Sequence, residues 1–384
     1  MARYEGLFES FFLGGFECST HRLASGKRLD EIAFTHHDRL AREDYLRLHE
    51  QGIAAARDGL RWHLIESTPG AYDFSSLLPM MRAARETNTQ VIWDLFHYGW
   101  PDWLGLFEPR FIDAFAKYAR EFARLWREES DIVLFACPTN EISFFSWAAG
   151  DAAAFNPFSH GRGDQLKEQL VRANIAACEA LWDIDKRTRI AQIDPMINVL
   201  PLDPNNPEHA REAEAYRVSQ YEAWDMLAGR VKPELGGDPK YLDIIGGNYY
   251  LRNQWFLGAG FGGFIEPENP RYRPLREIIE ELYARYQRPF FVAETGIEDE
   301  LRPKWFRYVC TEARAALQEG VELQGICLYP IVNHPGWDDD RHCHNGLWDY
   351  PNEQGQREIY QPLADELQDQ RKLFQELLPR RESV

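Results

Sequence analysis

The sequence predicts an α/β fold of the (β/α)8 TIM-barrel class, in which residues 1–384 form a single domain with loops inserted after the strands. Short apolar or β-branched runs recur about every 40 residues, and stretches with helical periodicity separate them. Eight such runs are present and no GxGxxG motif follows the first, so a closed barrel fits better than a doubly wound sheet. A barrel with inserted loops reaches 384 residues as one unit.

Each expected strand is a short apolar run that ends in polar, turn-forming residues. The eight runs are residues 11–19, 53–62, 90–97, 132–139, 189–194, 242–249, 289–294 and 323–331. Residues 110–129 predict an amphipathic helix, because apolar side chains recur there at spacings of three and four. These side chains are Phe111, Phe115, Tyr118, Phe122 and Leu125. Residues 165–183 and 302–319 follow the same pattern.

Charge and composition exclude several classes of partner. The chain carries 43 Lys and Arg against 61 Asp and Glu, for a net charge of -18, and its basic residues are scattered. Because no basic face can neutralise phosphates, nucleic acid is not an expected partner. No segment approaches the ~18 apolar residues of a membrane span, so no membrane partner is expected either.

The cysteines and the N-terminus predict a cytoplasmic protein. The six cysteines are dispersed, with no CxxC pair and no metal-type spacing, so most are expected to be buried thiols. The chain begins Met-Ala-Arg-Tyr-Glu-Gly and lacks the basic start, apolar stretch and cleavage site of a secretory signal. The sequence leaves the oligomeric state open.

The residues that close the predicted strands are unusually polar. Arg57 and Trp62 bound the polar end of the second run, and His97 closes the third. The fourth ends in Pro138-Thr-Asn-Glu141 and the seventh in Val292-Ala-Glu294. The carboxyl ends of barrel strands form one site, so Glu141 and Glu294 are expected to face one pocket.

Two carboxyl groups at one pocket indicate glycoside hydrolysis. One carboxylic acid protonates the leaving oxygen, while a second carboxylate attacks the anomeric carbon or activates water. Asn140 is a candidate to hold a sugar hydroxyl, and Arg57 a candidate to keep Glu294 ionised. The alternative, two solvated loop carboxylates, is disfavoured because both groups follow predicted strands.

These motifs resemble those of the (β/α)8 retaining glycoside hydrolases of clan A, which include the family 1 β-glucosidases and β-galactosidases. The resemblance spans most of the chain. Thr139-Asn-Glu141 is similar to the acid/base motif that closes the fourth strand. Phe291-Val-Ala-Glu294-Thr-Gly-Ile297 is similar to the nucleophile motif that closes the seventh.

The resemblance implies roles for further residues. Gly247-Asn-Tyr-Tyr250 is similar to a family 1 segment whose second tyrosine touches the nucleophile, which implicates Tyr250 and places Asn248 at the substrate. Arg57 matches the arginine beneath that nucleophile. His97 matches a histidine that binds sugar hydroxyls.

The rim that reads the sugar diverges from family 1. Those enzymes use a glutamine after the first strand, where this chain has Glu17, His21 or Arg22. They use a Glu-Trp pair after the eighth strand, where this chain has Gly336 and Trp337. With the glutamine and the glutamate replaced, buried hydroxyl groups of a glucosyl residue would lack hydrogen-bond partners. A simple glucoside is therefore not the expected substrate. Arg22 either recognises an acidic or substituted sugar or pairs with Glu17.

No cofactor or metal is expected. Residues 338–344 gather Asp, His and Cys, but His-x-His alone is a weak metal pattern, and such a loop more often contacts substrate or closes the barrel mouth. Its role is left open. The resemblance also implies a cis peptide bond between Tyr329 and Pro330, where proline makes cis far less costly.

The expected function is hydrolysis of a β-linked glycoside by double displacement, with Glu141 as acid/base and Glu294 as nucleophile. One alternative is a transglycosylase with the same two carboxylates, in which an acceptor sugar replaces water. The other is an inactive carbohydrate-binding barrel. In each case the expected partner is a carbohydrate.

Overall fold

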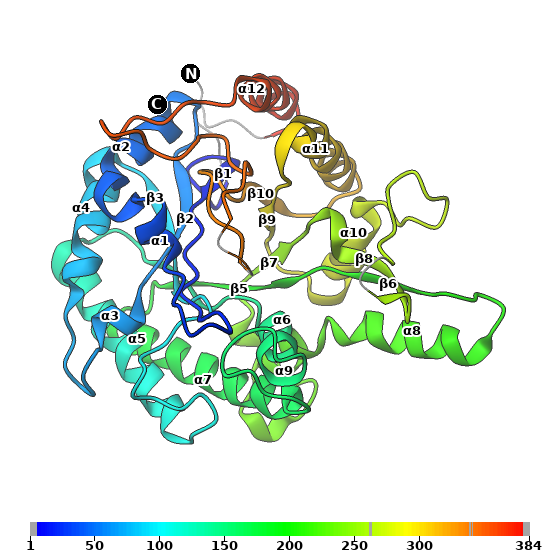
Figure 1. Cartoon of the computed structure of the whole chain (residues 1–384), viewed down its shortest axis with the longest axis horizontal. Helices are drawn as coiled ribbons and strands as arrows, with labels where there is room; N and C mark the ends of the chain where they lie inside the picture. Colours follow the sequence, from blue (N-terminus) through cyan, green and yellow to red (C-terminus); the bar gives the residue numbers. More distant parts are fainter. Residues whose placement is uncertain (1–5, 261–262, 338, 340, 379–384) are drawn as a thin grey trace.

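The computed structural model, which describes residues 6–260, 263–337, 339 and 341–378, contains a closed barrel of eight parallel strands surrounded by helices (Figure 1). The strand order around the barrel is β1-β10-β9-β7-β5-β4-β3-β2. These strands are β1 (Phe12–Gly15), β2 (Ala55–Gly59), β3 (Gln90–Phe96), β4 (Phe135–Thr139), β5 (Arg189–Pro195), β7 (Ile244–Asn248), β9 (Phe290–Thr295) and β10 (Leu323–Leu328). The predicted (β/α)8 class is confirmed, because each predicted run overlaps one barrel strand.

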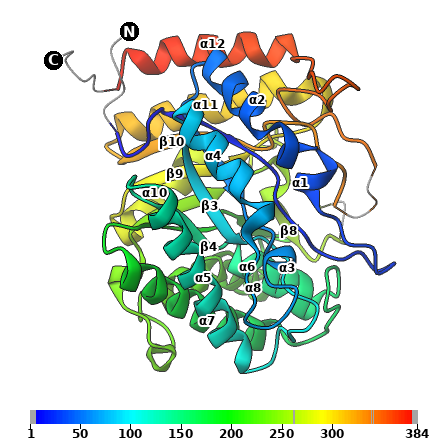
Figure 2. The ribbon, with the colours of Figure 1, turned by 90° about the vertical axis from the view of Figure 1, so that its left-hand side faces the viewer.

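Helices lie around the barrel and in the loops that connect its strands. They are α1 (Glu31–Phe34), α2 (His37–Glu50), α3 (Trp62–Ile65), α4 (Leu78–Thr87), α5 (Arg110–Glu129), α6 (Ile142–Phe145), α7 (Gly163–Ile184), α8 (Pro207–Ser219), α9 (Glu222–Leu227), α10 (Leu275–Tyr286), α11 (Arg302–Gln318) and α12 (Gln361–Gln375). The three predicted helices correspond to α5, α7 and α11. The last helix, α12, packs on α11 and closes the ring beside α2 (Figure 2).

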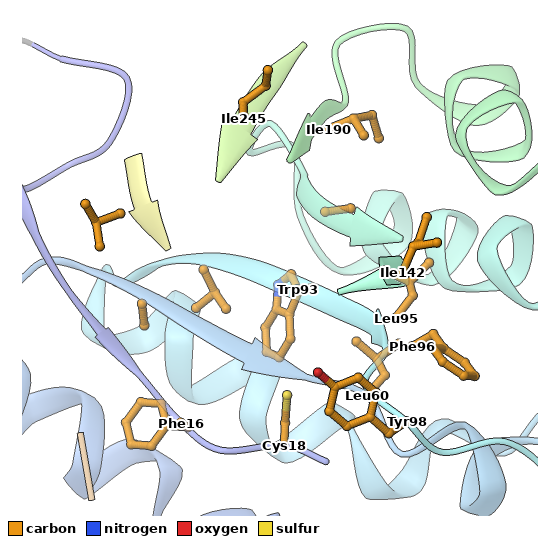
Figure 3. Packing of buried hydrophobic residues seen from close by; sticks show 14 of the residues in the cluster. Phe16, Cys18, Leu60, Trp93, Leu95, Phe96, Tyr98, Ile142, Ile190 and Ile245 are labelled. Atoms are coloured by element: carbon orange, nitrogen blue, oxygen red, sulfur yellow. The ribbon is translucent and has the colours of Figure 1, made fainter. Parts of the chain in front are cut away.

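The alternation of side chains along each strand separates two apolar clusters. Leu13, Ala55 and Ile92 belong to a cluster contributed by all eight barrel strands, which fills the barrel interior. Their neighbours Phe12, Ala56 and Val91 pack instead in the larger cluster beneath the helices. Figure 3 shows part of that outer cluster.

The same alternation brings polar groups into the barrel. Arg57 lies two residues after Ala55, and Asp94 lies two residues after Ile92, so both point inward above the apolar interior cluster. Both side chains are buried. The candidate site therefore rests on a packed apolar floor.

A second, two-stranded parallel sheet was not predicted. It pairs β6 (Asn198–Pro201) with β8 (Gln254–Leu257), and the Asn198 amide donates to the Gln254 side-chain oxygen at 2.9 Å. Both strands lie in loops that follow barrel strands, and each pairs with a partner more than 50 residues away, which the local sequence does not reveal. Within the described residues, the helices include none that is both long and apolar enough to cross a membrane.

Candidate active site

Glu141 follows β4 directly, in a backbone conformation that side chains rarely adopt. Its φ of 48° and ψ of 61° lie in the left-handed region. Its amide N–H donates to the carbonyl oxygen of Ile193 in β5 at 3.0 Å, which ties this turn to the next strand of the barrel. Such conformations cluster at functional sites, because the surrounding structure must hold them in place.

The Glu141 carboxyl group accepts one hydrogen bond on each oxygen. The Tyr98 hydroxyl donates to Oε2 at 2.5 Å, and the Asn248 amide donates to Oε1 at 2.9 Å. Only 6% of Glu141 is exposed. Burial, followed by the negative charge of Glu294, raises the pKa of Glu141 to about 8, and both hydrogen bonds oppose that rise.

Glu294 ends β9 and is held by a cation and a phenol. Arg57 Nη1 lies 2.9 Å from its Oε1, and the Tyr250 hydroxyl donates to its Oε2 at 2.8 Å. Burial raises the pKa of Glu294, and Arg57 is the strongest influence that lowers it. Arg57 contacts Glu294 and not Glu141, so it stabilises the ionised form of Glu294. At neutral pH, the one proton that the two carboxyl groups share is therefore bound to Glu141.

Arg57 connects the inward polar groups. Its Nη2 lies 2.5 Å from Asp94 Oδ2 and donates to the Asn140 side-chain oxygen at 3.1 Å. Its guanidinium carbon is 5.3 Å from the centre of the Tyr329 ring. A fully buried guanidinium with these partners stays charged, and it fixes the orientation of the Asn140 amide.

His97 is positioned by groups on both ring nitrogens. Its Nδ1 lies 3.0 Å from Asp94 Oδ2, and its Nε2 lies 3.1 Å from the Asn140 amide nitrogen. Since Arg57 occupies the Asn140 oxygen, the amide NH2 faces His97, and Nδ1–H is left to donate to Asp94. The structure thus brings His97 and Asn140 together, as predicted from the strand ends.

In the described part of the chain, one group of three side chains has potential metal-ligand atoms close enough together to bind one ion. Cys18, Asp94 and His97 each offer one atom within 4.8 Å of the others. Asp94 Oδ2, however, already lies against the Arg57 guanidinium, whose positive charge opposes a second cation. The loop residues His342 and His344 join no such group.

The predicted rim residues separate in the structure. Glu17 is buried at the mouth of the barrel, where its Oε1 accepts the Ser19 N–H at 2.8 Å and lies 3.6 Å from His97 Nε2. His21 is also buried, and its Nε2 lies 3.0 Å from the Trp337 carbonyl oxygen.

Of the two interpretations left open for Arg22, the pairing with Glu17 is not found, because Arg22 pairs with Asp102. Arg22 Nη2 lies 2.6 Å from Asp102 Oδ2, and Nη1 donates to the Gly26 carbonyl oxygen at 2.8 Å. Asp102 also accepts from Arg28 at 2.6 Å. Asp102 belongs to the loop after β3, a partner that the local sequence around Arg22 does not reveal.

Trp337 stands between an aromatic cluster and a cavity. Its ring centre lies 5.7 Å from that of Tyr98 and 5.9 Å from that of Phe155, with the planes steeply inclined. On its other side is a cavity of about 1220 Å³, also lined by Glu17, Tyr250 and His334. Asp338 and Asp340 of the same loop lie outside the described residues. The Tyr329–Pro330 bond is cis, as predicted.

Sequence reasoning missed three residues of this constellation. Tyr98 contacts Glu141, Asp94 joins Arg57 to His97, and His334 lines the cavity. Asp94 lies within the third strand and Tyr98 follows its end. Their position at the polar end of a strand could have identified both as candidate site residues. Tyr98 also has a positive φ of 64°, which the sequence does not indicate.

The arrangement is an asymmetric carboxyl pair above an apolar floor. One member is held by neutral donors and the other by a cation and a phenol. Such a pair can supply an acid and an ionised nucleophile at one pH. Asp94, below the pair, and Glu294 together compensate the charge of the buried Arg57.

Comparisons with known proteins place this geometry in context. No protein-family model matches the sequence. An alignment 110 positions long, which covers 25% of this chain, is 33% identical to the aryl-phospho-beta-D-glucosidase BglH of Bacillus subtilis. A segment covering 66% of this chain is 22% identical to a beta-galactosidase of Sulfolobus acidocaldarius. The matches span 22% and 60% of those relatives' own lengths.

Solved structures agree over nearly the whole chain. A beta-glucosidase from Thermotoga maritima in complex with glucoimidazole has a TM-score of 0.75 at 16% identity, covering 95% of this chain and 98% of its own. The AHE enzyme from Alicyclobacillus herbarius also has a TM-score of 0.75, at 17% identity, covering 96% and 99%. A family 1 β-glucosidase from Thermotoga maritima has 0.74 at 17% identity, covering 96% and 98%. The chain therefore has the (β/α)8 barrel fold of the family 1 β-glucosidases, the family that its strand-end motifs resemble.

Proposed function

We propose that this chain is a retaining β-glycosidase, with Glu141 as its acid/base and Glu294 as its nucleophile. The observation that carries the proposal is the unequal environment of the two carboxyl groups. Arg57 lies 2.9 Å from Glu294, whereas burial and the charge of Glu294 raise the pKa of Glu141 to about 8. One group is then protonated where the other is ionised, as double displacement requires.

In the first step, a Glu294 oxygen attacks the anomeric carbon while Glu141 gives its proton to the leaving glycosidic oxygen. The bond to the aglycone breaks, and a glycosyl ester on Glu294 forms. In the second step, Glu141 takes a proton from water, which displaces Glu294. Tyr250 and Arg57 position Glu294, and Tyr98 and Asn248 position Glu141.

The substrate is proposed to be a β-linked glycoside other than a simple glucoside. Gly336 provides no side chain where family 1 enzymes use a sugar-binding glutamate. Glu17 provides a carboxylate beside His97 where those enzymes use a glutamine. The names of the two sequence relatives, an aryl-phospho-beta-D-glucosidase and a beta-galactosidase, are consistent with a β-glycoside of another sugar.

A panel of aryl β-glycosides, uronides included, tests this function. We expect release of the phenol from at least one member by the wild type and none by Glu294→Gln. Addition of an acceptor sugar, followed by product analysis, separates hydrolysis from transglycosylation. Measurable sugar binding with no turnover on the whole panel would instead identify an inactive carbohydrate-binding barrel.

We further propose that residues 1–384 act as one catalytic domain in the cytoplasm. The six cysteines are all unpaired and buried, which suits a reducing compartment.

A further inference from the structure

The cavity beside Trp337 occupies one side of the barrel mouth. Glu17 follows β1, Tyr250 and Arg252 follow β7, Glu298 follows β9, and His344 follows β10. These four strands, β7, β9, β10 and β1, are consecutive around the barrel. Among the described residues, none from the loops after β3 or β4 lines this cavity.

The position of the acid/base indicates which end of a substrate this cavity faces. Glu141 follows β4, and β10 lies opposite β4 in the ring of eight strands. Because Glu141 protonates the leaving oxygen, the aglycone departs on the β4 side. Tyr250 lines the cavity and donates to Glu294 at 2.8 Å, so we assign the cavity on the β7 to β1 side to the glycone, the part of the substrate that becomes attached to Glu294.

The cavity is larger than one sugar ring requires. Its volume of about 1220 Å³ exceeds the ~300–1,000 Å³ of pockets that enclose drug-sized ligands, and a single pyranose is smaller than those ligands. Its lining includes both Glu17, which is buried, and Leu301, which is 51% exposed, so the cavity extends to the surface of the molecule. A glycone of one residue would leave the outer part filled with water.

The outer lining suits a neutral, hydroxyl-rich ligand. Three arginines and four carboxylates line the whole cavity, so their charges nearly cancel. Arg341 is already paired with Glu298, at 2.7 and 2.9 Å. Leu301 lines the same space with 51% of its surface exposed, which provides an apolar contact for the C–H groups of a sugar ring.

We propose that this outer cavity binds a second sugar residue of the glycone, so that the substrates are β-glycosides of neutral disaccharides or longer chains. The inference rests on the proposed function, since it uses Glu141 and Glu294 to orient the substrate. The enzyme would release the disaccharide intact and would not trim single residues from the non-reducing end.

Product analysis on aryl β-glycosides tests this directly. The wild type is given p-nitrophenyl β-glycosides of xylobiose, mannobiose, galactobiose and chitobiose, each beside the matching monosaccharide glycoside. We expect p-nitrophenol and an intact disaccharide from at least one pair, with kcat/KM at least about tenfold above that of the monosaccharide glycoside. Release of a monosaccharide with accumulation of the aryl monosaccharide glycoside would overturn the inference while the proposed function stands.

Two matched variants locate the subsite. Leu301→Asp replaces the apolar contact with a charge, whereas Leu202→Asp makes the same change at a leucine that is 56% exposed and does not line the cavity. We expect Leu301→Asp to lower the ratio of disaccharide to monosaccharide kcat/KM at least about tenfold, and Leu202→Asp to leave it unchanged. Equal ratios in both variants would contradict the assigned location. No hydrolysis of any aryl glycoside would overturn the proposed function itself.

Discussion

The Tyr98 hydroxyl lies 2.5 Å from Oε2 of Glu141, so a phenol donates directly to the carboxyl group proposed as the acid/base. Asn248 donates to the other oxygen at 2.9 Å. Both hydrogen bonds stabilise the ionised form, while burial and the charge of Glu294 stabilise the protonated form. The acid strength of Glu141 follows from this competition.

The pH dependence of kcat/KM should show the protonation of Glu141. The first step needs Glu141 protonated, so kcat/KM should fall as pH rises through about 8. The profile can be measured with an aryl glycoside across this range. Glu141→Gln should lose this basic limb but still form the glycosyl-enzyme slowly from an activated aryl glycoside. A basic limb that persists in Glu141→Gln would assign it to another group.

Tyr98→Phe should move the basic limb to higher pH. The hydroxyl lowers the pKa of Glu141, so its removal raises that pKa further. The control is Tyr241→Phe, which removes a hydroxyl that donates to Glu179 at 2.7 Å, outside the site. We expect the shift in the first variant only. An unchanged limb in Tyr98→Phe would show that this hydroxyl does not set the acid strength.

Arg57→Met should impair both activity and stability. The change leaves Asp94 and Glu294 buried without their cation, a loss that typically costs about 3–5 kcal/mol for a buried pair. It also removes the strongest influence that lowers the pKa of Glu294. Urea unfolding and kcat/KM measure the two effects. Arg189→Met, which breaks a half-buried pair with Asp243, is the control and should lose less stability.

His37 should make the free energy of unfolding fall at alkaline pH. It lies between Asp44 and Asp58 at 2.9 and 2.8 Å, and these carboxylates, against the effect of burial, raise its pKa to about 9. Its contribution is complete below its ordinary pKa near 6.5 and is lost as pH rises through about 9.

Urea unfolding at a series of pH values measures this contribution, which is on the order of 3 kcal/mol. His37→Asn should remove most of the pH dependence, whereas His209→Gln, on the exposed side of α8, should keep it. The same dependence in both variants would exclude His37 as its source.

The barrel and the carboxyl pair were predictable because each depends on local pattern. Strand runs and their polar ends repeat along the chain, and barrel topology brings the carboxyl ends of the strands together. Glu141, Glu294 and Arg57 could therefore be selected before their contacts were known, whereas Tyr250 was implicated only by the resemblance to family 1. Their roles remain proposals.

What could not be predicted depends on contacts between distant segments. Arg22 and Asp102 are 80 residues apart and meet only because the loop after β3 folds over the loop after β1. The role of Tyr98 depends on a positive φ that turns its hydroxyl toward Glu141. The cavity is lined by the loops after β9 and β10, and its size depends on the relative positions of these loops, which no single motif specifies.

Trapping of the covalent intermediate tests the central claim most directly. The enzyme is incubated with an activated fluorosugar β-glycoside of whichever sugar the panel identifies, and the labelled peptide is mapped by mass spectrometry. The account predicts one glycosyl adduct, on Glu294, with inactivation that substrate protects against. An adduct on another residue, or hydrolysis without any adduct and with inverted anomeric configuration, would contradict it.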